Sequence, residues 1–152
     1  MAAGEPSNDQ RTTDLRAKHY GFGWKALFVF IALGIVLEAL HGLKVDWYLS
    51  TSMSTRRHMW TLAHAHGTLL GLINIAFASY VPWHIEHRGE LHPWASRLFI
   101  LATVVMPAGF FLGGIGFYAG DPGLGILLVP VGGLFLIAGV YLCAGFGRKL
   151  KP

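Results

Sequence analysis

Residues 59–81 read MWTLAHAHGTLLGLINIAFASYV, an apolar segment of membrane-spanning length that contains two histidines, His64 and His66. At a rise of about 1.5 Å per residue, a helix of this length crosses the roughly 30 Å hydrocarbon core of a bilayer. A histidine is costly to place in hydrocarbon, so its presence in a membrane span indicates a functional site. This segment therefore predicts a membrane-spanning helix and a functional site at its histidines.

Three further apolar segments of similar length occupy 24–43, 94–119 and 123–146. The 152 residues are 53% hydrophobic and 13% charged, a composition that cannot supply an ordinary solvated surface. Alternation with a period of two residues is absent, and four short strands could not close a barrel. The sequence predicts an all-α integral membrane protein, a four-transmembrane-helix antiparallel bundle with one membrane domain at 21–152.

The first 20 residues are polar and show no apolar period, so we expect 1–20 to be a mobile tail outside the bundle. No small-residue cleavage site of the A-x-A kind follows the first apolar run. We therefore expect 24–43 to remain as a membrane span and not to be removed as part of a signal peptide.

Basic residues are distributed unequally between the two ends of the predicted spans. Nine lie on the side of both termini and three on the other: Arg11, Arg16, Lys18, Lys25, Arg88, Arg97, Arg148, Lys149 and Lys151 against Lys44, Arg56 and Arg57. The positive-inside rule then predicts N-in/C-in topology, and we expect a bacterial inner (cytoplasmic) membrane. Because these residues cluster where spans end, the net charge of +4 suits anionic headgroups and requires no nucleic-acid partner.

Polar residues of the first two spans are predicted to meet. Glu38 and His41 are three residues apart and share one helix face. His64 lies at about the same depth in the second span, so we expect Glu38, His41 and His64 to converge in the outer leaflet. His66 is rotated by about 200° from His64 and should face another helix or another subunit. Gly67, on the His64 face, predicts close helix approach and would give a flat cofactor a low wall.

One chemistry compatible with these residues is haem binding. A b-type haem takes neutral histidines as axial ligands, here His41 with His64 or His66. Its propionates would turn outward to Arg56 or Arg57, whose guanidinium groups bind carboxylates well.

Two other chemistries remain open. A metal site would use Glu38, His41, His64 and His66, and because Glu38 is the single carboxylate within the predicted spans, copper or zinc is favoured over a di-iron centre. A proton relay from Glu38 through His41 to His64 would need no cofactor.

The segment AHAHGTLLG at 63–71 resembles histidine-bearing transmembrane helices of the haem-copper oxidase and nitric oxide reductase superfamily, whose helix histidines hold haem iron or the neighbouring metal. The resemblance covers one helix. The catalytic subunit of that superfamily has many more helices and an adjacent His-His pair, which this chain lacks. The resemblance implies a small haem- or metal-binding relative or an accessory subunit, with ligand roles for His64 and His66.

The sequence thus predicts a histidine-based haem or metal site in a membrane protein of electron transfer or of a respiratory complex. A non-catalytic structural or assembly subunit and a small metal or proton transporter are the alternatives. The expected partners are the lipid bilayer and either further copies of the chain or a larger membrane complex.

The charge distribution makes the orientation testable. A reporter that is active only in the cytoplasm should work when fused after Leu150, and a reporter active only outside should work when inserted near Ser52. The opposite pattern would reverse the orientation and place the histidine site in the other leaflet.

Overall fold

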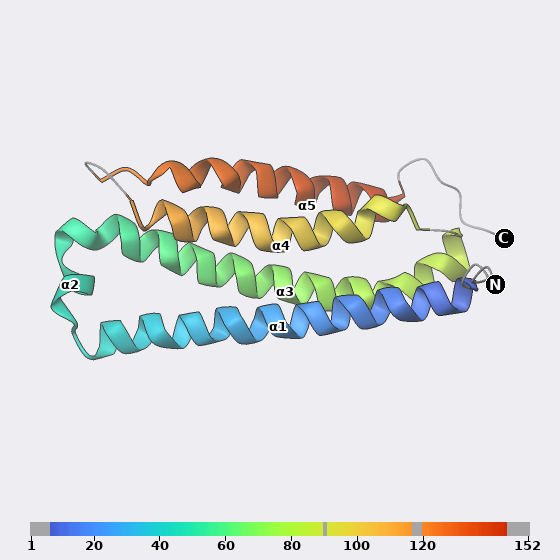
Figure 1. The fold of residues 1–152 in the computed structure, drawn as a ribbon, viewed down its shortest axis with the longest axis horizontal. Coiled ribbons are helices and arrows are strands. Elements are labelled where there is room, and N and C mark those ends of the chain that lie inside the picture. The colour runs from blue at the N-terminus through green and yellow to red at the C-terminus, as the bar shows by residue number, and fades with distance from the viewer. Residues whose placement is uncertain (1–6, 90, 117–119, 146–152) are drawn as a thin grey trace, which may run out of the picture.

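The computed structural model describes residues 7–89, 91–116 and 120–145. Within these ranges the chain forms four long helices, each antiparallel to its neighbours in the sequence (Figure 1). They are α1 (Asn8–Gly42), α3 (Ser54–Arg88), α4 (Pro93–Gly113) and α5 (Leu128–Ala144). The shorter elements are α2 (Asp46–Leu49) and the 3-10 helices η1 (Thr51–Met53) and η2 (Leu124–Leu127). The predicted all-α antiparallel four-helix bundle is confirmed.

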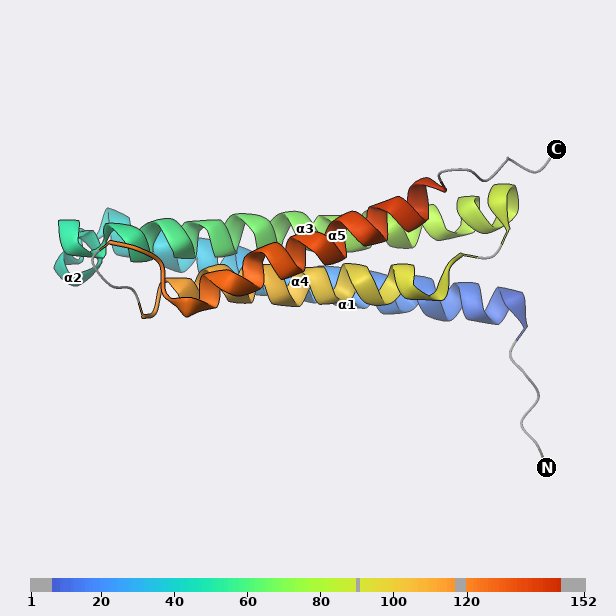
Figure 2. The same cartoon turned by 90° about the horizontal axis from the view of Figure 1, so that it is seen from above.

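The helix α3 holds the bundle together. It packs against α1 and against α4, while α5 packs mainly on α4. Figures 1 and 2 show an elongated bundle with α2 at one end and with the start of α1 and the end of α5 at the other. The start of α1 and the end of α5 therefore lie at the same end of the bundle, as four crossings require.

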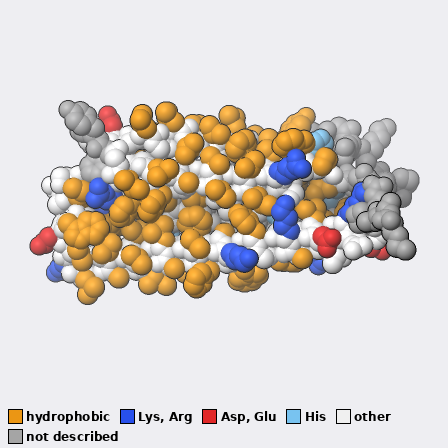
Figure 3. Space-filling model, in the orientation of Figure 1, with side chains coloured by type: hydrophobic (Ala, Val, Ile, Leu, Met, Phe, Trp, Pro, Cys, Tyr) orange, Lys and Arg blue, Asp and Glu red, His pale blue; other side chains and the backbone are white. Residues whose placement is uncertain are grey.

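Length and hydropathy make all four long helices suitable for crossing a bilayer, so the chain is an integral membrane protein. Hydrophobic side chains cover most of the face shown in Figure 3. Phe28 on α1 and Ile137 on α5 expose 77% and 68% of their surface, which lipid covers in a membrane.

The first helix begins earlier than the sequence predicts. The Ser7 hydroxyl accepts a hydrogen bond from the backbone N–H of Gln10 at 3.3 Å, which caps α1 at its start. Leu15 is half-buried in the core and His19 is fully buried, so α1 continues along the bundle through this polar stretch. The predicted tail boundary at residue 20 is therefore wrong, and residues 1–6 of that tail lie outside the described part of the chain.

The end of α3 also extends beyond its predicted limit. The predicted span ends at Val81, yet the helix passes through Pro82 and ends at Arg88. His84 is completely buried, and its Nδ1 lies 2.8 Å from the hydroxyl of Tyr80. That hydroxyl donates to the carbonyl of Cys143 on α5 at 2.7 Å. Contacts with α5 therefore hold these turns helical.

The helices α1 and α3 approach closely at a series of glycines. Gly34 lies against the ring of His64, and Gly67 lies against the ring of Phe30. Farther along, Gly71 lies against the backbone of Gly23. Glycine permits this separation because it has no Cβ. The predicted contact between the first two spans is confirmed.

Substitutions of two glycines in α1 test this contact. A Cβ at residue 23 would lie 2.7 Å from Cγ1 of Ile75 and 2.8 Å from the carbonyl oxygen of Gly71, so Gly23→Ala should destabilise the protein by about 1–3 kcal/mol. No atom lies within 4 Å of a Cβ at Gly21, and Gly21→Ala should stabilise the helix by up to about 1 kcal/mol. Unfolding in detergent, followed by circular dichroism during SDS titration, measures both; equal stability of the two variants would contradict the packing.

Candidate functional site

Polar residues gather at the end of the bundle that carries α2. A recess of about 340 Å³, here called the polar recess, lies between α1, α2 and α3. Its lining comprises Leu37, Glu38, His41, Tyr48, Ser54, Arg57, His58 and Thr61. The end of α1 and the start of α3 thus bring together residues that are about 20 positions apart in the sequence.

A second hollow of about 350 Å³ adjoins the first and is called the His64 hollow. It shares Leu37, Glu38 and Thr61 with the polar recess and extends to Gly34 and His64. Of the residues that the sequence expects to converge, Glu38 lines both hollows, His41 lines the polar recess and His64 lines the His64 hollow. The side chains of Glu38 and His41 are exposed, whereas His64 is half-buried.

The imidazole of His64 is held in one orientation. Its Nδ1 lies 2.6 Å from the backbone carbonyl oxygen of Phe30. A carbonyl only accepts, so Nδ1 carries the proton and Nε2 of the neutral ring keeps its lone pair. Histidines that bind metals commonly have this arrangement, in which a hydrogen bond at one nitrogen sets the tautomer for the other.

His66 does not share this site. Its Nδ1 lies 2.9 Å from the carbonyl oxygen of Leu62, and its ring centroid lies 4.7 Å from that of Phe110 on α4. The structure therefore separates His66 from His64, in agreement with the rotation expected for two positions along a helix. His66 therefore lines neither of the hollows that Glu38 lines, and it does not face the predicted site.

The two arginines proposed for haem propionates bind backbone carbonyls instead. Nη1 of Arg57 donates to the carbonyl oxygens of Tyr48 at 2.7 Å and Ser50 at 2.9 Å. Nε of Arg56 donates to the carbonyl oxygen of Gly114 at 3.0 Å. These bonds tie the start of α3 to the α2 connection and to the end of α4, so both guanidinium groups serve the fold.

Side chains occupy the contact between α1 and α3 where the sequence analysis placed a flat cofactor. The face of Gly67 that was expected to receive it is covered by the ring of Phe30. The imidazole of His64 likewise fills the space beside Gly34. Among the residues that the structure describes, no three His, Cys, Asp or Glu side chains are already positioned to hold a metal ion.

A second polar cluster, which we call the His19 network, lies toward the start of α1 and was missed by the sequence analysis. His19 is fully buried, with Nδ1 2.7 Å from Oδ1 of Asn74 and Nε2 2.8 Å from Oγ of Ser96. Nδ2 of Asn74 donates to Oγ1 of Thr103 at 2.8 Å. The hydroxyl of Thr103 donates to the carbonyl oxygen of Phe99 at 2.8 Å. One network therefore joins α1, α3 and α4.

The bonds of this network assign its protons. The amide oxygen of Asn74 accepts, so Nδ1 of His19 donates to it. In the neutral ring Nε2 then accepts from the hydroxyl of Ser96. All of these partners are protein groups, which is the arrangement that hydrocarbon requires of buried polar atoms. Sequence reasoning placed His19 in a tail, although Asn74 and Thr103 within apolar spans signalled that a polar partner was needed.

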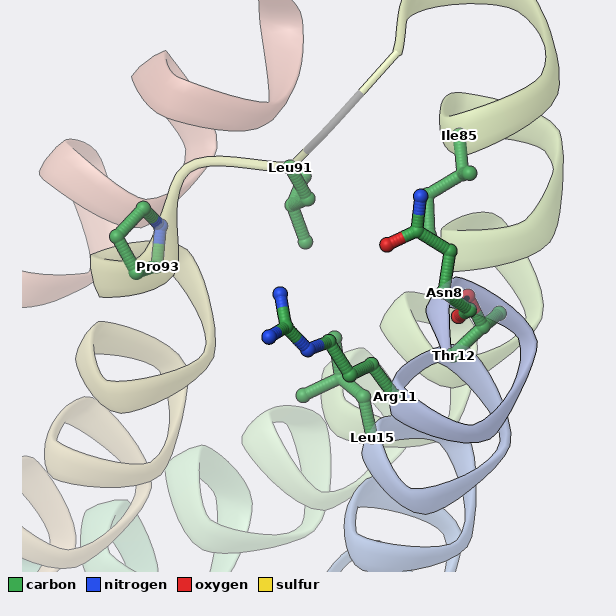
Figure 4. A pocket seen from close by; sticks show the side chains of 7 residues that line it. All are labelled: Asn8, Arg11, Thr12, Leu15, Ile85, Leu91 and Pro93. Atoms are coloured by element: carbon green, nitrogen blue, oxygen red, sulfur yellow. Dashed lines mark hydrogen bonds between the residues drawn. The ribbon is translucent and has the colours of Figure 1, made fainter. Parts of the chain in front are cut away.

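A third cavity, of about 300 Å³, lies where the start of α1 meets the end of α3 and the start of α4. Figure 4 shows the side chains of Arg11 and Leu91 extending toward each other across it. None of the predicted ligand residues lines this cavity.

Comparisons with known proteins place the chain in no family: no family model matches it, and neither a curated protein nor a solved structure matches it. Function is therefore inferred from its own residues.

The His19 network predicts a stability effect. Asn74→Leu keeps a similar volume but removes the acceptor of His19 and the donor to Thr103, so the free energy of unfolding should fall by about 1–3 kcal/mol. Ser79→Ala is the control. Oγ of Ser79 lies 2.9 Å from the hydroxyl of Tyr20, so this substitution also removes a hydrogen bond between α1 and α3, but at an exposed position. The control should change stability by less than about 0.5 kcal/mol. SDS titration measures the free energy of unfolding of both variants, and an equal loss of stability in the two would refute the role of burial.

Proposed function

We propose that the polar recess and the His64 hollow together bind one copper or zinc ion and that the chain is a metal-binding membrane protein. The observation that carries this proposal is the 2.6 Å bond from Nδ1 of His64 to the carbonyl of Phe30. It leaves the Nε2 lone pair of His64 for a ligand beside a hollow that Glu38 also lines.

The proposed ligands are Nε2 of His64, the carboxylate of Glu38 and the imidazole of His41. Copper(II) and zinc both accept imidazole and carboxylate ligands, and water completes their coordination. Because Glu38 and His41 are exposed, their side chains can turn toward the ion when it arrives. This accounts for a site that is not already assembled among the described residues.

The choice of ion decides the role. Copper would allow one-electron transfer at the membrane surface, the role expected from the sequence, while zinc would serve binding or transport without redox change. A b-type haem is disfavoured because Phe30 and His64 fill the contact between α1 and α3. If no metal binds, a structural or assembly subunit becomes the better proposal.

Metal content tests the proposal on the full chain in detergent. After dialysis against Cu²⁺ or Zn²⁺, elemental analysis should find about one ion per chain in the wild type. His64→Ala and His41→Ala should lower the affinity by more than the roughly 10- to 100-fold that follows loss of an outer-shell partner. Glu38→Gln should weaken binding without eliminating it, since an amide oxygen is a poorer ligand than a carboxylate.

The matched control is His87→Ala, an exposed histidine near the other end of α3. It should retain wild-type metal content. Wild type and His64→Ala with equal metal content would refute the proposal, and a Soret band in the purified wild type would identify haem in place of copper or zinc.

A further inference from the structure

An apolar groove of about 580 Å³ runs between α1 and α4, and we call it the α1–α4 groove. Phe22, Ala26, Val29 and Leu33 line it from α1, and Val104 and Ala108 line it from α4. It lies within the segments that are apolar enough to cross the membrane. A groove there faces lipid, so hydrocarbon is its natural content.

The groove exists because α1 and α4 each pack on α3 and touch one another little. The bond between His19 and Ser96 brings the two helices together toward the start of α1. Beyond that bond, the small side chains of Ala26 and Ala108 leave space between them. Thr103, a member of the His19 network, lines the groove at this end.

One charged residue interrupts the apolar lining. Lys25 lines the groove together with Thr103, which is ten residues from each end of α4. A lysine facing the middle of a span is expensive unless its ammonium group reaches polar surroundings. Its side chain also points toward the helix N-terminus, so its stem can follow the groove wall toward the start of α1.

Two more basic residues extend from this end of the groove. Lys18 precedes Lys25 by seven positions, and Arg97 precedes Val104 by seven, so each lies on the groove face of its helix. All three basic side chains are exposed, and the guanidinium of Arg97 lies 5.0 Å from the ring centroid of Trp94. Figure 3 shows basic side chains among hydrophobic ones over α1 and α4, toward the end at which α1 begins.

We propose that the α1–α4 groove binds an anionic phospholipid, with one acyl chain in the groove and its phosphate beside Lys18, Lys25 and Arg97. The eleven-residue rise from Phe22 to Leu33 is about 16 Å, which is long enough to hold much of one acyl chain. The charge distribution predicts that this end faces the cytoplasm, where anionic lipids concentrate. The apolar lining suits the acyl chain of such a lipid, and the three basic side chains suit its phosphate.

Native mass spectrometry of the full chain in detergent tests this site with phosphatidylglycerol and phosphatidylcholine of identical acyl chains. The wild type should retain phosphatidylglycerol more strongly than phosphatidylcholine. Lys25→Gln and Arg97→Gln should each weaken phosphatidylglycerol binding by about fivefold, the usual effect of one basic residue near a membrane surface. Lys44→Gln, at the opposite end of α1, should leave binding unchanged.

Filling the groove provides the second measurement. Ala108→Phe should reduce binding of both lipids, while Ala65→Phe, an exposed position on α3 outside the groove, should reduce neither. Equal wild-type retention of the two lipids would overturn the proposal, as would unchanged binding in Lys25→Gln and Arg97→Gln. A third outcome would also overturn the proposal: a wild type that binds no lipid but forms dimers, which Ala108→Phe abolishes. The groove would then be the contact site for a second copy of the chain.

Discussion

The close contact between α1 and α3 sets the positions of His19 and Asn74 and of the residues around the His64 hollow. Gly34 and Gly67 admit the rings of His64 and Phe30 from the facing helix, and Gly71 meets Gly23 backbone to backbone. These contacts fix the register of the two helices. That register brings His19 level with Asn74 and Glu38 into the hollow that His64 lines. A bundle with another register would leave these groups in hydrocarbon without partners, at a cost of several kcal/mol each.

The two polar regions of the bundle are built differently. The His19 network is buried, with each side chain bonded to protein groups of another helix or of its own. Such a closed network suits the joining of helices, because it leaves nothing for a ligand to satisfy. The polar recess is open, and its Glu38 and His41 are exposed. Between them the ring of Phe30 and the glycines of the α1–α3 contact form an apolar layer that separates the two polar regions.

The order of packing also explains the outer surface. Because α3 takes α1 and α4 on different sides, these two helices meet at the His19–Ser96 bond and then separate. The His19–Ser96 bond joins α1 to α4, and the groove lies beyond it, where these two helices diverge.

Composition and the length of apolar runs determined the four spans, the all-α class and the antiparallel order, because hydrocarbon leaves few other ways to satisfy a backbone. Helical periodicity also separated His64 from His66 and put Glu38 and His41 on one face. Tertiary structure alone decided that residues 8–20 are helical, that His84 is buried and that Phe30 occupies the face of Gly67. Each of these depends on a partner distant in sequence: Asn74 for His19, Cys143 for the Tyr80–His84 pair and the register of α1 for Phe30. Local sequence patterns carry no record of such partners, so only packing could assign them.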